Sequence, residues 1–260
     1  MCASAQTSGV ARSHRGAASV TGVNPRNMLP RPPDRNRLLE ALPRIDLRRF
    51  LTACESVELA FADVLYTPRE RLTHVYFPIV GSISLIMPVD GSNALEVAIV
   101  GNEGMFGIPI VLGVDVSPLR ALVQGAGTAL RIGAAPFSRE LERSPALKRA
   151  VDRYVFVQLA QLAQIAACTR FHVVEARLAR WLLVTQDRAH APTFHVTQEF
   201  LAFMLGVRRV GVTEAAGALQ QRSLIQYRRG RMTILDRRGL KAAACGCYQA
   251  DLDSYERILG

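Results

Sequence analysis

The sequence contains no long apolar run. Within its 260 residues no apolar stretch reaches about 18 residues, the length that a membrane-spanning helix requires. The first residues likewise lack the apolar segment of a secretory signal. We therefore expect a cytoplasmic protein with no membrane partner.

Cysteine is also scarce. The five cysteines are odd in number and scattered, so in a reducing compartment they are free thiols by default. Cys168 and His172, four residues apart, would share a helix face and could bind a metal ion, but a buried Cys beside an unrelated His is the commoner arrangement. Cys245 and Cys247 form a single C-x-C pair, which we interpret as structural or incidental, with a redox role as the alternative. We predict no metal site and identify no cofactor.

The positive charge is concentrated rather than spread evenly. Residues 38–167 are nearly neutral, with twelve basic and thirteen acidic side chains, whereas residues 168–241 carry thirteen basic and five acidic ones. Such a local excess is typical of a surface that binds a polyanion. A merely soluble basic surface is the alternative.

The N-terminal half predicts a tail followed by a β domain. Residues 1–36 are rich in Ser, Ala, Gly, Arg and Pro, which predicts a disordered tail. A short helix over 37–50 is expected next. Between residues 55 and 133, about seven short runs of Val, Ile, Tyr and Phe alternate with turn residues, and no helical pattern intervenes. This pattern indicates an all-β sandwich or roll.

A long helix is predicted from Pro145 to about Arg170. Ser144 is a good N-cap, and proline is favoured in the first helical turn. One continuous apolar stripe follows at helical spacing; it consists of Val151, Val155, Leu159, Leu162 and Ala166. The helix could pack on its own β domain or on a copy of itself in a parallel dimer. A second helix, 174–186, is expected to bury Trp181 and to expose Arg177 and Arg180.

Residues 196–227 carry the strongest signal. Thr197 can cap a short helix over 198–205, and a turn at 206–207 leads to a second helix over 208–221, which makes a helix-turn-helix. Two short strands then flank a turn that carries three arginines, which predicts a β-hairpin with a cationic tip suited to phosphate groups. The candidate DNA contacts are Thr197, Gln198, Arg208, Arg209, Thr213, Glu214, Arg228, Arg229 and Arg231.

These segments together resemble the Crp/Fnr family of bacterial transcription regulators over about residues 37–248. The markers are YFPIVGSISL, VGNEGMFGIPIVLG, RLARWLL, TQEFLAFMLGVRRVGVT and SLIQYRRGRMTI. The resemblance implies an α+β fold with a cyclic-nucleotide-binding-like β-roll, a long dimerisation helix and a C-terminal winged helix-turn-helix. It implies these divisions: tail 1–36, β-roll sensor 37–143, dimerisation helix 144–170, DNA-binding domain 171–248 and C-terminal tail 249–260.

The resemblance also implies a role for Arg209, which matches the arginine that reads a base at the start of the family's recognition helix. Its guanidinium could pair with O6 and N7 of a guanine. However, Val210 stands where the family often has Glu, Glu214 occupies an often basic position, and Arg208 replaces the usual Ser. The operator sequence therefore cannot be inferred from the operators of better-known family members.

The effector site departs further from the family. Cyclic-nucleotide binders use a Phe-Gly-Glu-Leu stretch whose Glu binds the ribose, followed by an Arg for the cyclic phosphate. Here Ile108 cannot accept a hydrogen bond and Pro109 has no N–H to donate, while a second register places Leu119 rather than Arg120 at the phosphate. A tentative pocket thus comprises Gly107, Ile108, Arg120 and Ala121. We predict that cyclic AMP is not the effector; cyclic di-GMP and apolar molecules remain open.

Other branches of the family bind an iron–sulfur cluster through N-terminal cysteines. Cys2 and Cys54 are the only cysteines before the long helix, too few for four-thiolate ligation. We predict a homodimeric, sequence-specific DNA-binding regulator that is not an enzyme. Its expected partners are double-stranded DNA with a near-palindromic operator, a second copy of the chain and, as a further candidate, RNA polymerase. The alternative is a ligand-binding signalling protein in which DNA contact is secondary.

Overall fold

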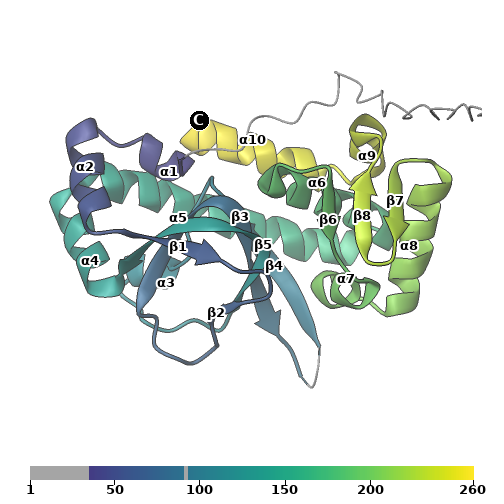
Figure 1. The fold of residues 1–260 in the computed structure, drawn as a ribbon, viewed down its shortest axis with the longest axis horizontal. Coiled ribbons are helices and arrows are strands. Elements are labelled where there is room, and N and C mark those ends of the chain that lie inside the picture. Colours follow the sequence, from purple (N-terminus) through teal and green to yellow (C-terminus); the bar gives the residue numbers. More distant parts are fainter. Residues whose placement is uncertain (1–34, 91–92) are drawn as a thin grey trace, which may run out of the picture.

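The computed structural model describes residues 35–90 and 93–260 and divides them between two domains joined by a long helix (Figure 1). The predicted tail over 1–36 lies outside the described residues except at its end. There the prediction is wrong, because Asn36 is buried and caps the first helix. Its amide also donates hydrogen bonds to the carbonyls of Pro78 and Gly104, at 2.9 and 2.8 Å. Within the described ranges, no helix combines the length and apolar character needed to cross a membrane.

The N-terminal domain is a β-roll of antiparallel strands in the order β1-β5-β3-β4, with β2 paired to β5. Its elements are α1 (Arg37–Glu40), α2 (Arg44–Thr52), β1 (Glu55–Leu59), β2 (Val64–Tyr66), β3 (His74–Pro88), β4 (Ala94–Val100), α3 (Ile108–Val111), β5 (Arg120–Gly133) and α4 (Ala134–Arg143). The expected seven or so short strands are five, because β3 and β5 are long and pair across repeated register shifts. Gly127 permits this: a Cβ there would lie 2.2 Å from the Val80 carbonyl oxygen.

The long helix α5 (Pro145–Phe171) begins as predicted, with Ser144 Oγ accepting a hydrogen bond from the Leu147 N–H at 3.1 Å. The helix has a face packed on its own β domain and a second face that is free to pack on a copy of itself. Val151 is fully buried in the core of the chain's own β-roll, so its prediction as a dimer residue is wrong. Further along the helix, Phe156 and Leu159 are exposed, at 56% and 60%.

The C-terminal domain contains the predicted helix-turn-helix and hairpin. Its elements are α6 (Val174–Ala189), β6 (Thr193–His195), α7 (Gln198–Leu205), α8 (Arg209–Gln221), β7 (Ile225–Arg228), β8 (Arg231–Ile234) and α9 (Arg237–Ala243). The expectation that Arg177 and Arg180 face solvent is wrong. Arg177 is buried and donates to the Leu205 carbonyl, and Arg180 pairs with Asp251 at 2.7 Å.

The predicted C-terminal tail over 249–260 is instead most of a helix, α10 (Cys247–Leu259), which lies against α5 (Figure 1). Tyr255 Oη donates to the Glu103 carbonyl at 2.8 Å, and the Arg180–Asp251 pair ties α10 to α6. These partners lie far away in the sequence, so the local pattern of charged residues gave no sign of them. The helix bridges the two domains.

A buried polar network crosses the boundary between the β-roll and α6. Trp181 Nε1 donates to Glu96 Oε1 at 2.8 Å, while Ser84 Oγ lies 2.6 Å from Glu96 Oε2 and 2.5 Å from Gln124 Oε1. A hydroxyl has one proton and cannot donate to both oxygens, whereas a protonated Glu96 can donate to Ser84 and leave that proton for Gln124. Burial raises the pKa of Glu96 to about 7, which agrees with a protonated carboxyl.

We expect Glu96→Gln to reduce the pH dependence of stability. Because burial raises the pKa of this carboxyl from its ordinary value of 4.5 to about 7 in the folded protein, the stabilisation is complete below about pH 4.5 and is lost as pH rises through about 7. Urea unfolding at pH 5 and pH 8 should show the wild type losing about 1–3 kcal/mol more than the variant. Glu58→Gln is the control, because Glu58 lies exposed on strand β1. An equal change in unfolding free energy between pH 5 and pH 8 for the wild type and for Glu96→Gln would contradict the assignment.

Candidate nucleic-acid interface

The helix-turn-helix is fixed by a cap, a turn and a shared core. Thr197 Oγ1 accepts a hydrogen bond from the Phe200 N–H at 3.1 Å and starts α7. Gly206 ends this helix with a φ of 60°, in the left-handed region that glycine tolerates. The inward faces of α7 and α8 then meet in the domain core through Leu201, Met204, Val212, Ala215, Ala216 and Leu219. The orientation of the second helix is therefore set by apolar packing.

The outward face of α8 presents the predicted polar residues together with one apolar residue. Arg208 is the exposed N-cap, without a side-chain capping bond, and Arg209 is the exposed first residue. Thr213 Oγ1 lies 3.0 Å from Gln198 Oε1, which links this face to the start of α7. Val210 is 60% exposed beside Arg209. The exposed N-terminus of the helix thus combines positive charge with an accessible apolar contact.

The hairpin places its arginines on and beside a tight two-residue turn. Arg229 and Gly230 have φ values of 50° and 76°, and positive values at both positions are those of a type I′ turn, which matches the twist of paired strands. Arg228 stands directly opposite Arg231 across the strands, and Arg231 stands opposite His195 on β6. Like charges opposite each other destabilise a sheet. A bound anion would relieve this repulsion.

The α8 surface and the hairpin are physically connected. Gln220 Oε1 accepts a hydrogen bond from the Tyr227 N–H at 2.8 Å, and Tyr227 Oη donates to the Val196 carbonyl at 3.0 Å. Gln220 therefore positions β7 against α8. The predicted contact residues lie at the start of α7, at the start of α8 and on the hairpin, and all except the half-buried Gln198 are exposed. Sequence reasoning missed His195, Tyr227 and the exposure of Val210.

The tentative effector residues have unlike surroundings. Ala121 is fully buried, whereas Arg120 is exposed at the start of β5. Ile108 packs against the core of the roll. Gly107 has a φ of 115°, and a Cβ there would lie 2.9 Å from the Val75 side chain. The interior near this segment contains aromatic rings, with the Phe106 centroid 6.1 Å from those of Tyr66 and Tyr76.

A cavity of about 610 Å³ lies elsewhere, where β4, α5, α6 and α10 meet. Its lining includes the acidic residues Glu96 and Asp251 and the basic residues Arg177, Arg180 and Arg188. None of the four predicted effector residues lines it. The cavity therefore belongs to the boundary between the domains and not to the tentative site.

Comparison with known proteins identifies the C-terminal domain. Residues 176–243 match the Crp-like helix-turn-helix domain. No curated protein matches the chain. The sequence match therefore covers the part of the chain that holds the candidate interface.

Solved structures match over both domains. The c-di-GMP responsive global regulator CLP of Xanthomonas campestris is 18% identical, covers 74% of this chain and 99% of that chain, and has a TM-score of 0.61. FixK2 of Bradyrhizobium japonicum is 13% identical, covers 74% of this chain and 98% of that chain, and has a TM-score of 0.62. A transcriptional regulator of the CRP/FNR family from Thermus thermophilus is 23% identical, covers 73% of this chain and 98% of that chain, and has a TM-score of 0.60. These matches confirm the predicted resemblance and the predicted α+β architecture.

Proposed function

We propose that this chain, which has the fold of Crp/Fnr transcription regulators, is a sequence-specific DNA-binding regulator that acts as a homodimer. The observation that carries the proposal is the cationic outward face of the winged helix, where Arg228 and Arg231 face each other across the hairpin. Phosphate groups would offset this repulsion, and DNA presents them in a regular array. The exposed start of α8, with Arg208 and Arg209, adds two cations beside a helix N-terminus.

The contacts divide into two kinds. Arg209 reads a guanine in the major groove, and Val210 contacts the methyl group of a thymine, the base feature that suits an exposed apolar side chain. Arg208 and the three hairpin arginines hold phosphates, which fixes position but carries no direct sequence information. Thr197, Gln198 and Thr213 contact the DNA backbone around α8. Glu214 faces the bases of the major groove and limits which base pairs are accepted there.

The two copies associate through the free face of α5. Phe156 and Leu159 are followed on this face by the exposed small residues Ala163, Ala166 and Ala167. Small residues allow two helices to approach closely, while the larger pair supplies the apolar area that dimerisation buries. A two-fold axis along α5 would place two recognition helices on successive major grooves, with half-site centres roughly 34 Å apart.

We expect the combined change of Arg228, Arg229 and Arg231 to Ala to weaken binding to every DNA sequence alike. Each lost phosphate contact should reduce the slope of log affinity against log salt by about 1, hence by about 3 in total. Gel shifts on a selected palindrome and on random DNA, repeated over a salt series, measure both effects. The double change of Arg139 and Arg143 in α4 to Ala is the control for loss of positive charge away from the proposed interface.

The same experiment tests the proposed function. A wild-type protein that prefers the selected palindrome to random DNA supports a sequence-specific regulator. The second candidate is a ligand-binding signalling protein, which the cavity of about 610 Å³, with charged residues in its lining, favours. That protein would bind palindrome and random DNA equally, and all of its DNA affinity would disappear at high salt.

We expect cyclic AMP to bind with a dissociation constant well above the micromolar range. Ile108 offers no acceptor for the ribose, and leaving a buried hydroxyl unpaired costs about 1–3 kcal/mol. Pro109 stands in the first turn of α3 and removes one N–H from the phosphate site. Together these losses amount to at least about a hundredfold in affinity.

Isothermal titration of the purified protein with cyclic AMP and cyclic GMP measures this affinity. Cyclic di-GMP is the third ligand to titrate, because the similar regulator from Xanthomonas campestris is described as responsive to it. Micromolar binding of cyclic AMP coupled to tighter operator binding would contradict the prediction.

A further inference from the structure

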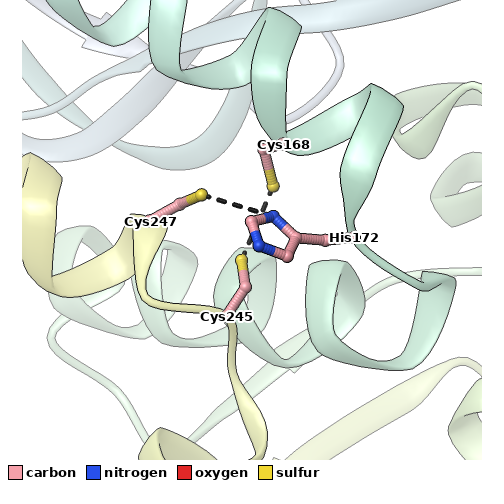
Figure 2. A group of neighbouring side chains, drawn as sticks. All are labelled: Cys168, His172, Cys245 and Cys247. Carbon is pink, nitrogen blue, oxygen red and sulfur yellow. Dashed lines mark hydrogen bonds between the residues drawn. The ribbon is translucent and has the colours of Figure 1, made fainter.

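Four metal-ligating side chains converge where α5, α6 and α10 meet. Cys168 lies in the last turn of α5, His172 is the C-cap of that helix, Cys245 lies between α9 and α10, and Cys247 begins α10. Figure 2 shows the three sulfur atoms arranged around the His172 ring. One ligand atom from each residue lies within 4.8 Å of all the others. Segments more than 70 residues apart thus bring four ligands to one point.

Two of the separations between ligand atoms are close to those of a tetrahedral site. The Sγ atoms of Cys168 and Cys245 are 3.5 Å apart, and Cys247 Sγ is 3.5 Å from His172 Nδ1. Zinc bonds of about 2.3 Å to sulfur and about 2.0–2.1 Å to nitrogen place tetrahedral ligands roughly 3.8 Å apart for two sulfurs and roughly 3.5 Å for sulfur and nitrogen. The sulfur atoms are also too far apart for a disulfide, which requires about 2.05 Å.

The surroundings suit a thiolate site. The three cysteines are buried, with exposures of 2%, 9% and 3% for Cys168, Cys245 and Cys247. Gln164 Nε2 donates to Cys247 Sγ at 2.9 Å, an outer hydrogen bond of the kind that orients a metal ligand. Three thiolates and a divalent ion carry one net negative charge. The guanidinium groups of Arg177 and Arg180, which interact electrostatically with the Cys168 sulfur, offset that charge.

We propose that Cys168, His172, Cys245 and Cys247 bind one zinc ion in a Cys₃His structural site. The ligand set is one that zinc uses in closed structural sites, and thiolates select thiophilic ions over magnesium or calcium. An iron–sulfur cluster fits less well. In a [4Fe–4S] cluster each cysteine binds a different iron, and in a [2Fe–2S] cluster the four ligands are divided between two irons. In both, some ligand atoms therefore lie further apart than ligands that all share one ion.

The site occupies the joint between the long helix and the DNA-binding domain. His172 and Val173 link α5 to α6, while Cys245 and Cys247 anchor the start of α10, which lies along α5. One ion therefore holds the end of α5, the joint itself and the C-terminal helix together. The orientation of the winged helix relative to α5 depends on this joint, so metal loss would loosen the recognition surface without touching it.

The test is the metal content of the untagged full-length protein, purified under reducing conditions without chelator. Elemental analysis should find about one zinc per chain in the wild type and in Cys54→Ser, the matched control. Cys54 lies in the β-roll, away from the cluster, and burial raises the pKa of its thiol to about 12. The double variant Cys168→Ser/Cys245→Ser should contain less than a tenth of this zinc.

His172→Gln keeps the test decisive if the cysteine variants do not fold, because His172 is exposed and its loss leaves the core intact. This variant should release zinc to a chelator at concentrations more than tenfold lower than the wild type, while circular dichroism shows it folded. Cobalt exchange into the wild type should give the visible absorption of tetrahedral thiolate coordination. A metal-free wild type with titratable thiols, a Cys168–Cys245 disulfide, or iron with inorganic sulfide would each overturn the proposal.

Discussion

Leu159→Glu should convert the proposed dimer into a monomer and reduce operator affinity by at least about a hundredfold. Leu159 is 60% exposed on the face of α5 that also exposes Phe156. In a two-fold arrangement the substitution occurs twice, so two carboxylates would enter one apolar interface. Burying unpaired charges costs several kcal/mol for each ion. The operator loss follows because two half-sites bound by one dimer gain affinity from their linkage, and a monomer forfeits that gain.

Light scattering at micromolar concentration and gel shifts on a selected palindrome measure the two effects of this change. Ile45→Glu is the matched control: Ile45 is 76% exposed on α2, at the far end of the β-roll from the winged helix (Figure 1). The control should remain a dimer with unchanged DNA binding. A wild-type protein that is monomeric both alone and with operator DNA would contradict the proposed dimer.

The exposed face of α5 also shows which structural features an apolar stripe in the sequence can and cannot predict. The spacing from Val151 to Ala166 predicts one helix correctly, but it does not distinguish packing on the same chain from packing on a copy. In the structure, the first turns of α5 bury Val151 in the chain's own β-roll, while later turns leave Leu159 exposed. The division depends on where the roll ends, which is a property of the tertiary fold.

The C-terminal domain was the most predictable region because its signals are local. The Thr197 cap, the left-handed Gly206 and the Arg229–Gly230 turn each depend on residues within a few positions. Signals that depend on distant partners were missed. Arg177 is buried because the Leu205 carbonyl accepts its hydrogen bond, and the cluster proposed to bind zinc joins residues 168 and 245.

The β-roll was predicted, but the number and length of its strands were not, for a different physical reason. Glycines inside β3 and β5 lie where the sequence pattern predicts breaks between separate short strands. In the structure they let long strands bend: Gly81 has a φ of 89°, and a Cβ at Gly125 would lie 2.9 Å from Ser82 Oγ. A glycine that ends a strand and one that curves it look identical in the sequence, because both supply backbone freedom without a side chain.

Arg209→Ala should weaken binding to the cognate operator by about 1–3 kcal/mol and relax the preference at one base pair. The expected loss exceeds that of any single phosphate contact, because a bidentate pair with guanine discriminates against every other base. Arg209 is placed for this role as the exposed first residue of α8, next to the exposed Val210. Apolar packing of α8 against α7 fixes the direction from which it would enter a groove.

Arg208→Ala is the matched control for the Arg209 substitution. It removes the same charge from the neighbouring position. Because Arg208 is proposed to contact a phosphate, its loss should weaken binding to all DNA sequences about equally. Selection of binding sites from a random pool, carried out with wild type and both variants, separates the two roles. The Arg209 variant should lose information at one position in each half-site, symmetrically about the centre, while the Arg208 variant should keep the wild-type profile. If both variants relaxed the same position, Arg209 would not be the residue that reads the base.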